Sequence, residues 1–312
     1  MAKGIKKLVL FDAHAIIHRA YHALPDFATS KGAPTGALYG LCLMLLSIIE
    51  KFKPDYIVAA YDLPKPTYRH EAFKDYKAGR AKTDEALIEQ IKYSRKIFEA
   101  FGIPIYDKEG FEADDVIGTI VEDTKKEKDL EVIIASGDMD TLQLVSGEKV
   151  EVFTLKKGIK DTILYDEDAV LKRFNFGPEL IADYKGLRGD PSDNIPGIKG
   201  IGEKIAGILI TKFGSIERIY EALAKSDEEF IKAGLTARQI GLVRDGKEDA
   251  EFSKMLATIR RDAPINFKMP KNKFSENIDF AYKSIDQRLK SPLYFLSNSL
   301  NISGLKRLST LR

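Results

Sequence analysis

The sequence predicts an α/β protein in which a mostly parallel central sheet is flanked by helices and followed by a second, helical domain. Short apolar runs at Lys7–Phe11, Tyr56–Tyr61 and Glu131–Ala135 alternate with segments of helical periodicity, which is typical of a parallel sheet covered on both faces. After about Leu171 the pattern becomes helical, with Gly/Pro-rich turns around Gly189–Gly202. The 312 residues, 44% of them hydrophobic, are enough for two such domains.

In chain order, the first expected element is a buried strand at Lys7–Phe11. A helix over roughly Tyr39–Phe52 follows a Gly- and Pro-containing loop, and Tyr56–Tyr61 is the next buried strand. Helical periodicity over Glu85–Phe101 ends at Gly102, a favourable residue just after a helix. The remaining expected elements are a strand at Ile103–Tyr106, a helix over Asp114–Lys126 and a strand at Glu131–Ala135. We expect a first domain over residues 1–171, a helical domain over 172–268 and a C-terminal extension over 269–312.

The composition limits the kinds of cross-link and metal site that the chain can form. Lys plus Arg number 49 and Asp plus Glu number 47, so the net charge of +2 does not by itself indicate a nucleic-acid binder. The single cysteine, Cys42, excludes a disulfide framework and a cysteine-based zinc site. The four histidines, His14, His18, His22 and His70, show no Cys–His ligand spacing. Any bound metal is therefore expected to be a hard ion held by oxygen ligands.

Targeting and membrane signals are not expected. The first apolar run ends at Asp12, too soon for the apolar core of a secretory signal. The most apolar stretch, Ala37–Ile49, is shorter than the roughly 18 residues of a membrane span, and we interpret it as a buried helix. We therefore expect a soluble cytoplasmic protein with no membrane contact.

Charge is segregated along the chain. Between Asp107 and Asp140 there are twelve acidic and four basic residues, whereas basic residues predominate in Lys65–Lys96 and after Lys254. An acidic block of this kind is commonly a solvated face. Because basic segments flank it, a second interpretation is open, in which clustered carboxylates hold divalent ions and the basic segments hold a polyanion.

Aspartates follow three of the predicted strands. They are Asp12, Asp62 and Asp138, the last followed by Asp140. Ligand sites in open α/β sheets lie beyond the carboxyl ends of the strands, so we expect these side chains to converge at one sheet edge. Each aspartate alone is as readily a turn or cap residue; the convergence of three is more informative.

The segment Gly110–Asp115 adds Glu112, Asp114 and Asp115. Acidic residues suit a helix N-terminus, which accounts for Asp114 or Asp115 but less well for Glu112. Repulsion among so many carboxylates is unfavourable without cations to offset it. The excess therefore favours a two-metal site of the kind that promotes phosphodiester hydrolysis, with Mg²⁺ as the ion.

The most specific string is GDPSDNIPGIKGIGEK, Gly189–Lys204. Asp190 and Asp193 could reach the same metal site. Pro196–Gly202 is expected to form a tight hairpin before a helix that starts at about Glu203; its glycines allow close backbone approach, and N–H groups at a helix start suit a phosphate. Taken alone, such a hairpin is as readily an ordinary turn between helices.

Together these motifs resemble the bacterial 5′-nuclease family, the flap endonucleases that include the N-terminal domain of DNA polymerase I. The resemblance covers about Lys7–Ile265. Its motifs fall in the family's order: the Asp12 strand end, Asp62 with Thr67–Glu71, Tyr76-Lys77 with Arg80, Gly110–Asp115, Ser136–Asp140 and Gly189–Lys204. It implies a PIN-like nuclease domain with a helical arch over about 64–96, and a helix–three-turn–helix module as the second domain.

The resemblance implies two divalent-ion sites, occupied by two Mg²⁺ ions for which Mn²⁺ can substitute. The first would use Asp12, Asp62, Glu112 and Asp114; the second would use Asp138, Asp140, Asp190 and Asp193, with Asp115 nearby. A K⁺ ion would bind around Ile198 and Ile201 with a contribution from Ser192. Duplex DNA would contact Gly197, Lys199, Gly200, Gly202 and Lys204.

In the arch, Arg69, Lys77 and Arg80 correspond to family positions that contact the scissile phosphate or the flap. Tyr76 corresponds to a position where an aromatic ring can stack on a base, and Arg19 to one in the helix after Asp12. Simpler interpretations stay open, in which Arg69 pairs with a nearby acid, Glu71 or Asp75, and Tyr76 belongs to the core.

The sequence departs from the family pattern at three positions. Ala13 stands where Gly is usual, Pro191 where Ser is more usual, and Met139 where Lys or Arg is frequent. None of these changes removes a carboxylate. We therefore expect an active enzyme.

The activity implied by the resemblance is structure-specific hydrolysis of DNA phosphodiesters in replication and repair. Expected substrates are 5′ flaps, branched or nicked duplexes and RNA–DNA primer ends, cut as a 5′-3′ exonuclease and flap endonuclease. A monomer that is associated with the nucleoid and cooperates with a DNA polymerase is expected. No polymerase segment follows before Arg312, which fits a free-standing nuclease or a fragment of a longer protein.

Three other functions explain the residues less well. The alternative is a DNA junction-binding protein that does not cut. Such a protein would be expected to have lost carboxylates of the metal site, and this sequence has lost none. A ribonuclease of the small toxin type does not account for the helical domain. A magnesium-dependent phosphatase for small molecules accounts for neither the hairpin nor the basic arch.

Overall fold

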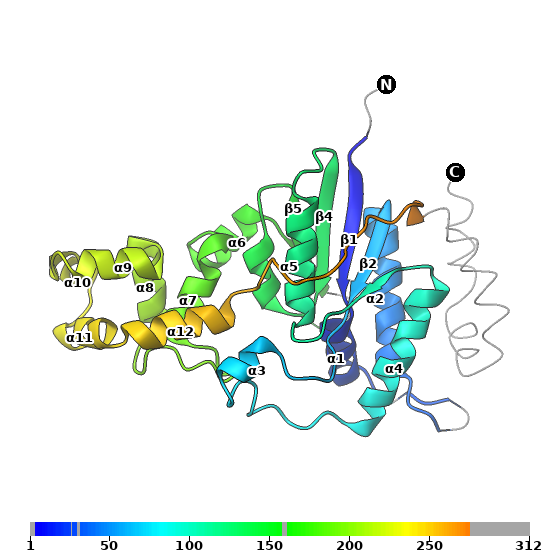
Figure 1. Ribbon diagram of the computed structural model, residues 1–312, viewed down its shortest axis with the longest axis horizontal. Coiled ribbons are helices and arrows are strands. Elements are labelled where there is room, and N and C mark those ends of the chain that lie inside the picture. The colour runs from blue at the N-terminus through cyan, green and yellow to red at the C-terminus, as the bar shows by residue number, and fades with distance from the viewer. Residues whose placement is uncertain (1–3, 26, 30–31, 158–160, 275–312) are drawn as a thin grey trace.

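A six-stranded sheet forms the centre of the computed structural model, which describes residues 4–25, 27–29, 32–157 and 161–274 (Figure 1). The strands are β1 (Lys6–Asp12), β2 (Tyr56–Ala60), β3 (Ile105–Tyr106), β4 (Leu130–Ser136), β5 (Val150–Lys157) and β6 (Asp161–Tyr165). Their order is β3-β2-β1-β4-β5-β6, and every neighbouring pair is parallel except β5 with β6. The predicted mostly parallel sheet is confirmed.

Helices flank this sheet and form a region beside it. The first part of the chain contains α1 (Ala13–Ala23), α2 (Gly36–Phe52), α3 (Tyr68–Ala72), α4 (Glu85–Ala100), α5 (Ala113–Thr124) and the 3₁₀ helix η1 (Met139–Leu144). The second part contains α6 (Glu167–Phe174), the 3₁₀ helix η2 (Pro178–Leu180), α7 (Ile181–Arg188), α8 (Glu203–Phe213), α9 (Ile216–Leu223), α10 (Glu228–Lys232), α11 (Ala237–Asp245) and α12 (Lys247–Ala257). In the described part of the chain, no helix is both long and apolar enough to cross a membrane.

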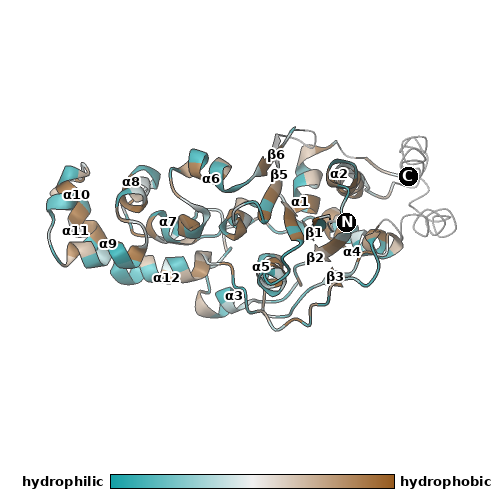
Figure 2. Ribbon diagram, turned by 90° about the horizontal axis from the view of Figure 1, so that it is seen from above, coloured by the Kyte–Doolittle hydropathy of each residue, from teal (hydrophilic) through white to brown (hydrophobic). Residues whose placement is uncertain are grey.

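Each face of the sheet buries its own apolar core, because alternate residues of a strand point to opposite faces. On one face, Val9 and Phe11 of β1 pack with α1, α2 and α4. On the other face, Leu8 and Leu10 pack with α5, and this core continues into the helical region. Figure 2 shows α1 and α2 on one side of the strands and α5 on the other. The helical region is therefore joined to the sheet through the α5 side.

The predicted elements agree with the structure to within a few residues. Helix α2 begins at Gly36, three residues before the predicted start, where the side-chain oxygen of Gln90 accepts hydrogen bonds from the N–H groups of Ala37 and Leu38. The hairpin of β5 and β6 was not predicted. Its second strand is an antiparallel edge strand whose only apolar run in the sequence is the three-residue stretch Ile163–Tyr165.

The segment 64–96, expected to form a helical arch, is helical at its two ends. Helix α3 and the start of α4 are separated by turns and extended backbone over residues 73–84. Lys77 lies in this stretch with φ = 57°, a left-handed conformation that a continuing α-helix does not allow. The arch is thus a loop between two helices.

A buried ion pair between Arg69 of α3 and Asp115 of α5 joins three segments of the chain. Arg69 is 3% exposed and Asp115 is fully buried, and two guanidinium nitrogens lie 2.7 and 2.9 Å from the two carboxylate oxygens. The same guanidinium donates to the carbonyls of Leu256 and Thr258 at the end of α12. Asp115 also accepts the N–H of Arg260. The pair therefore links the base of the arch, the start of α5 and the end of α12.

After α12, residues 258–274 return across α5 to the opposite side of the sheet (Figure 1). A Cβ atom at Gly118 would lie 2.7 Å from the carbonyl oxygen of Arg260, so this close approach depends on glycine. Further along, the N–H of Ala263 donates to Thr119, and buried Phe274 packs in the core beside α2. Of the C-terminal extension over 269–312, residues 275–312 lie outside the described residues.

The glycine-rich string makes a compact turn between α7 and α8. Gly189 and Gly197 have φ values of 74° and 60°, and a Cβ atom on Gly197 would lie 2.1 Å from the nitrogen of Gly189. The N–H of Gly197 donates to Ser253 of α12, and the N–H of Ile198 donates to the carbonyl of Leu187. The hairpin is thus packed tightly onto both α7 and α12.

Replacing Arg69 by leucine should destabilise the protein strongly, because the carboxylate of Asp115 would stay buried without a counter-charge. We expect Arg69→Leu to lower the free energy of unfolding by about 3–5 kcal/mol and the melting temperature by roughly 10 °C. The matched control is Arg244→Leu, which removes an exposed ion pair with Asp227 and should cost less than about 1 kcal/mol. Equal losses in a thermal melt of the two variants would contradict this assignment.

Candidate functional site

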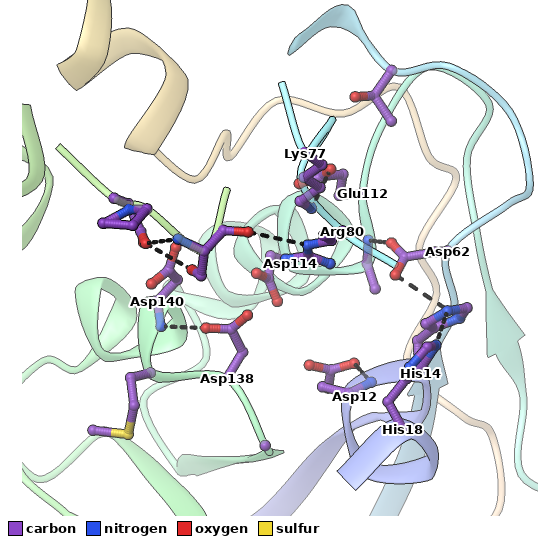
Figure 3. A pocket seen from close by; sticks show the side chains of 18 of the residues that line it. Asp12, His14, His18, Asp62, Lys77, Arg80, Glu112, Asp114, Asp138 and Asp140 are labelled. Carbon is purple, nitrogen blue, oxygen red and sulfur yellow. Dashed lines mark hydrogen bonds and ion pairs between the residues drawn. The ribbon is translucent and has the colours of Figure 1, made fainter. Parts of the chain in front are cut away.

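A cleft of about 1290 Å³ opens at the carboxyl edge of β1, β2 and β4. The strand order reverses between β1 and β4, which is where open α/β sheets place their ligands. Carboxylates from several segments line the cleft. Figure 3 labels six of them, Asp12, Asp62, Glu112, Asp114, Asp138 and Asp140, and Asp190 lines the cleft as well. The three strand ends marked in the sequence therefore share one cavity.

Hydrogen bonds to neighbouring elements hold the carboxylates at the first two strand ends. Asp12 caps α1 by accepting the N–H of Ala15 at 3.0 Å, and its other oxygen accepts the Ser136 hydroxyl at 2.6 Å. Asp62 accepts the N–H of Ala113, the first residue of α5, at 2.7 Å. The starts of α1 and α5 are thereby fixed at the cleft.

On the other side of the cleft, Asp138 accepts the N–H of Asp140 at 2.9 Å. Lys185 of α7 contacts both Asp140 and Asp190, with its Nζ 2.5 Å from the latter. Asp190 also accepts two hydrogen bonds from Ser192. Lys185 thus places a positive charge between carboxylates of the sheet and of the helical region.

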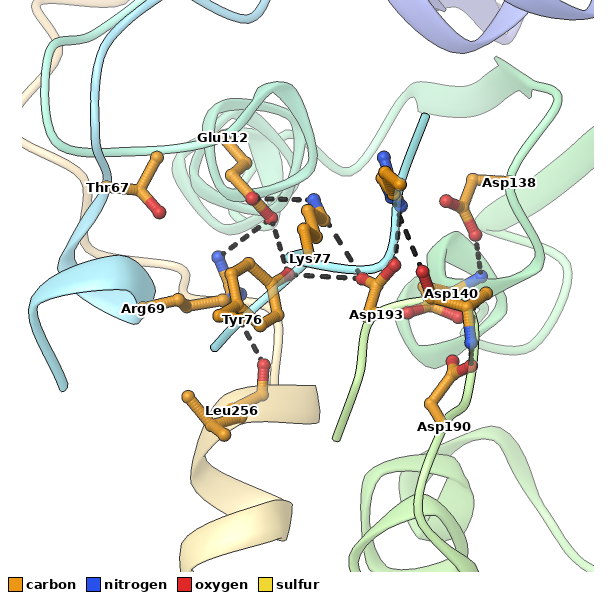
Figure 4. Close-up of polar contacts among 12 residues, drawn as sticks. Thr67, Arg69, Tyr76, Lys77, Glu112, Asp138, Asp140, Asp190, Asp193 and Leu256 are labelled. Atoms are coloured by element: carbon orange, nitrogen blue, oxygen red, sulfur yellow. Dashed lines mark hydrogen bonds and ion pairs between the residues drawn. The ribbon is translucent and has the colours of Figure 1, made fainter. Parts of the chain in front are cut away.

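A second set of ion pairs connects the arch with α5 and with the loop after α7 (Figure 4). The Nζ of Lys77 lies 2.6 Å from Glu112, and Arg80 lies 2.5 Å from Asp193. The Tyr76 hydroxyl lies 3.2 Å from Glu112 and 3.1 Å from Asp193. The arch therefore neutralises one carboxylate from each part of the fold.

Burial and mutual repulsion disturb the protonation of the clustered carboxylates. Burial raises the pKa of Asp12 to about 7, with further contributions from the charges of Asp62 and Asp138. Burial and the charge of Asp138 likewise raise the pKa of Asp140 to about 7, even though Lys185 opposes the shift. Burial and the charges of the other aspartates raise the pKa of Asp114 well above its usual value.

Asp190 differs from these three. Burial would raise its pKa, but the contacts with Lys185 and Ser192 outweigh burial and hold the pKa below its ordinary value. The raised pKa values of Asp12, Asp114 and Asp140 therefore reflect burial and mutual repulsion that exceed the available positive charge, even where Lys185 contacts Asp140. A divalent cation would supply that charge.

The donor chemistry of the cleft fits Mg²⁺ or Mn²⁺, because the ligands it offers are carboxylate oxygens. Among residues 4–274, as far as they are described, no three His, Cys, Asp or Glu side chains form a ready-made ion site. In this arrangement Lys77, Arg80 and Lys185 pair with Glu112, Asp193, Asp140 and Asp190. A divalent ion that takes Glu112, Asp140, Asp190 or Asp193 as a ligand would therefore compete with the lysine or arginine that pairs with it.

Two expected roles do not fit this conformation. Both oxygens of Asp115 bind Arg69, so this carboxylate has no capacity left for a metal ion. Tyr76 is 4% exposed, packed beside Ile195, Leu256 and Phe73, and its ring is therefore not available to stack on a base. The simpler interpretation of Tyr76 as a core residue applies here.

The basic residues also differ in their surroundings. Arg69 is buried and pairs with Asp115 and Glu112, not with Glu71 or Asp75 as the simpler interpretation had it. Arg19 donates to the carbonyl of Gly137 at 3.3 Å, beside Asp138. Lys77 and Arg80 line the cleft.

The residues expected to bind duplex DNA lie in the hairpin after α7. Lys199, Gly200, Gly202 and Lys204 are exposed, whereas Gly197 is buried. Of the three residues expected around a K⁺ ion, Ile198 and Ile201 are buried in this turn, where the Ile198 carbonyl accepts the N–H of Ile201. Ser192 instead lines the carboxylate cleft.

Sequence reasoning missed several residues of the cleft. Lys185 received no role, although it lies in the last turn of α7, five residues before Asp190. The four histidines lack Cys–His ligand spacing in the sequence, yet all of them line the cleft: His14, His18, His22 and His70. The signal in the sequence was the i, i+4, i+8 spacing of His14, His18 and His22, which places these three side chains on one face of a helix.

Stability should depend jointly on pH and divalent ions. Because the folded state raises the pKa of Asp12 and Asp140 from 3.8 to about 7, their contribution to stability is greatest below pH 4 and is lost as the pH rises through 7. Mg²⁺ at about 100 times its Kd should add roughly 2.7 kcal/mol at pH 8, which is about 5–10 °C in melting temperature, and much less at pH 5.

Differential scanning fluorimetry with and without Mg²⁺ checks this prediction. The control is the double variant Asp12→Asn, Asp140→Asn, whose pH dependence should be flatter and whose response to Mg²⁺ should be small. An equal Mg²⁺ effect at both pH values in the parent protein would contradict the proposed carboxylate repulsion.

Comparisons with known proteins cover nearly the whole chain. Residues 7–175 match the model of the 5′-3′ exonuclease N-terminal, resolvase-like domain, and residues 176–279 match that of the 5′-3′ exonuclease C-terminal SAM fold. DNA polymerase I of Bacillus caldotenax is 41% identical over 90% of this chain, and the 5′-3′ exonuclease of Aquifex aeolicus is 36% identical over 84%. The match spans 30% of the polymerase but 84% of the exonuclease.

Solved structures share the fold at lower identity. The 5′-exonuclease of phage T5 with bound zinc ions has a TM-score of 0.64 at 22% identity, covering 91% of this chain and 99% of the other. The catalytic core of Rad2 in complex with DNA substrate has a TM-score of 0.57 at 15% identity, covering 96% and 92%. By the two family models and the Aquifex relative, the chain belongs to the 5′-3′ exonuclease family of nucleases.

Proposed function

We propose that this chain is a metal-dependent, structure-specific 5′ nuclease that hydrolyses DNA phosphodiesters as a 5′-3′ exonuclease and flap endonuclease. The observation that carries the proposal is the cleft itself, where carboxylates from three strand ends, α5 and the loop after α7 face one cavity bordered by lysine and arginine. Its substrates would be 5′ flaps, nicks and RNA–DNA primer ends. The DNA substrate in the Rad2 complex supports DNA as the ligand.

Two divalent ions would share the carboxylates. Asp12, Asp62, Glu112 and Asp114 would hold one, and Asp138, Asp140, Asp190 and Asp193 the other, while Asp115 keeps its structural pairing with Arg69. When bound, such ions supply an activated nucleophile and neutralise charge in phosphodiester hydrolysis. The metal ions of the T5 structures support metal dependence; Mg²⁺ is proposed because its preferred ligands are oxygens.

The chain's own cations would exchange partners during this process. In the free protein Lys77 pairs with Glu112, and Arg80 pairs with Asp193. Once divalent ions neutralise those carboxylates, Lys77 and Arg80 are released to contact the scissile phosphate, where fixed positive charge favours the transition state. Arg19, which lies beside Asp138, is proposed to assist them from α1.

Duplex binding is assigned to the hairpin after α7. Exposed Lys199 and Lys204 flank Gly200 and Gly202, so backbone N–H groups and ammonium groups are available to duplex phosphates. A K⁺ ion held by carbonyl groups near Ile198 and Ile201 would reinforce this turn. The chain would thus recognise duplex shape and a single strand near the arch without reading bases.

The wider setting is also part of the proposal. We place the protein at the nucleoid, acting as a monomer in replication and repair together with a DNA polymerase. The polymerase relatives, of which this chain spans about 30%, carry the matching region in the same polypeptide.

Cleavage of a 5′-labelled flap duplex tests the activity. Mg²⁺ should release the flap and EDTA should prevent this, and Asp138→Asn should slow cleavage by at least about 100-fold, the scale of losing one group that stabilises a transition state. The matched control is Asp245→Asn, an exposed aspartate at the end of α11, which should cut at the parental rate. Tight flap binding with no product in Mg²⁺ or Mn²⁺ would instead indicate a non-cutting junction binder.

If the hairpin binds duplex DNA, changing its lysines should weaken duplex affinity without slowing the cleavage step. Lys199→Ala with Lys204→Ala should weaken duplex affinity and reduce the slope of log Kd against log salt by roughly 0.9 for each lost phosphate contact. Single-turnover cleavage at saturating enzyme should change little. The control pair Lys225→Ala with Lys232→Ala should leave the slope unchanged, and an unchanged slope in the first pair would contradict the assignment.

A further inference from the structure

Three histidines on α1 occur at successive turns, and the first two are directed at each other. The Nε2 atoms of His14 and His18 lie 3.2 Å apart, and the two rings stack with their centroids 4.8 Å apart. Both side chains line the cleft (Figure 3). Two imidazole nitrogens at this separation cannot both carry a proton, so at least one presents a lone pair to the space between them.

The second ring nitrogen of His14 is held in a way that favours a free Nε2. Its Nδ1 has no hydrogen-bond partner within the described residues and faces an oxygen of Asp62 at 3.9 Å. A proton on Nδ1 is attracted to that carboxylate, which leaves the lone pair on Nε2. Histidines that bind metals commonly direct their other nitrogen at a carboxylate in this manner.

The spacing of the two Nε2 atoms matches that of two ligands on one transition-metal ion. Nitrogens bound at about 2.0–2.1 Å from Zn²⁺ and separated by 3.2 Å subtend an angle of roughly 100° at the ion, between octahedral and tetrahedral values. Imidazole nitrogens favour Zn²⁺, Ni²⁺ or Cu²⁺ over Mg²⁺, which prefers oxygen.

We propose that His14 and His18 form a transition-metal site that is separate from the carboxylate centre and takes Zn²⁺ with water as the remaining ligands. The histidines supply two ligands from one helix, consistent with the absence of a three-residue ion site among the described residues. Because the pair faces the cleft, the open coordination positions of the ion are directed at the path proposed for the nucleic acid. This proposal concerns ion binding and does not depend on the nuclease activity.

Titration of the metal-free protein with ZnCl₂ in saturating Mg²⁺ tests the site by isothermal calorimetry. Because Zn²⁺ also binds carboxylates, saturating Mg²⁺ competes for those ligands, and the difference in Zn²⁺ affinity between the parent protein and the histidine variants reports on the nitrogen ligands. His14→Gln and His18→Gln should each weaken Zn²⁺ affinity by at least about tenfold. Zn²⁺ should also shift the ring-proton NMR signals of both histidines.

Three controls separate this site from its neighbours. His22→Gln, one turn further along α1, and Asp138→Asn should both leave the Zn²⁺ affinity unchanged, and thermal melts without metal confirm that each variant folds. No Zn²⁺ binding by the parent protein, or binding that survives both His14→Gln and His18→Gln, would overturn the proposal. So would loss of binding in Asp138→Asn or in His22→Gln.

Discussion

The buried pairing of Arg69 with Asp115 is the interaction on which the geometry of the cleft depends. An isolated charge in the interior is very unfavourable, so the two side chains must meet, and each has further hydrogen bonds that determine where they meet. Arg69 binds the end of α12 through the carbonyls of Leu256 and Thr258, and Asp115 binds the start of α5 through the N–H of Glu112. One pair therefore sets the position of the arch relative to α5, which carries Asp114 into the cleft.

Repulsion among the carboxylates of the cleft acts against the stability that the Arg69–Asp115 pair provides. The cleft gathers more carboxylates than its own lysines and arginines neutralise, and the raised pKa values of Asp12, Asp114 and Asp140 express that imbalance. The site is thus destabilising on its own, and bound cations would relieve the repulsion. Stability in the surrounding cores, supplied by the two faces of the sheet, allows the chain to tolerate the repulsion.

The sequence predicted those features that depend on local pattern. The convergence of Asp12, Asp62 and Asp138 could be predicted because each follows an apolar run and because the carboxyl ends of parallel strands meet at one edge of the sheet. The sequence did not predict the burial of Asp115 and left the burial of Tyr76 open, because their partners are distant in the chain. Asp115 meets Arg69 across 46 residues, and Tyr76 meets Asp193 across 117.

The same reasoning explains why the arch was predicted incompletely. Its charge pattern and its ends were visible, but the left-handed Lys77 depends on a hydrogen bond from its N–H to the carbonyl of Asp193 in the helical region. Local propensity carries no information about such a contact. The role of Lys185 was hidden for a related reason, since its partner Asp140 lies 45 residues away on the sheet.

The two parts of the fold are held together by packed surfaces, which bears on how a two-ion centre could assemble. Asp190 and Asp193 belong to the loop after α7, and α7 packs along α12, whose end is held by Arg69. The helical region therefore brings its carboxylates to the sheet edge as part of a packed arrangement of α7 and α12. In the proposed two-ion centre, the adjustable components would be the long side chains of Lys77, Arg80 and Lys185. Exchange of their ion pairs for divalent ions would be a smaller change than movement of the whole helical region.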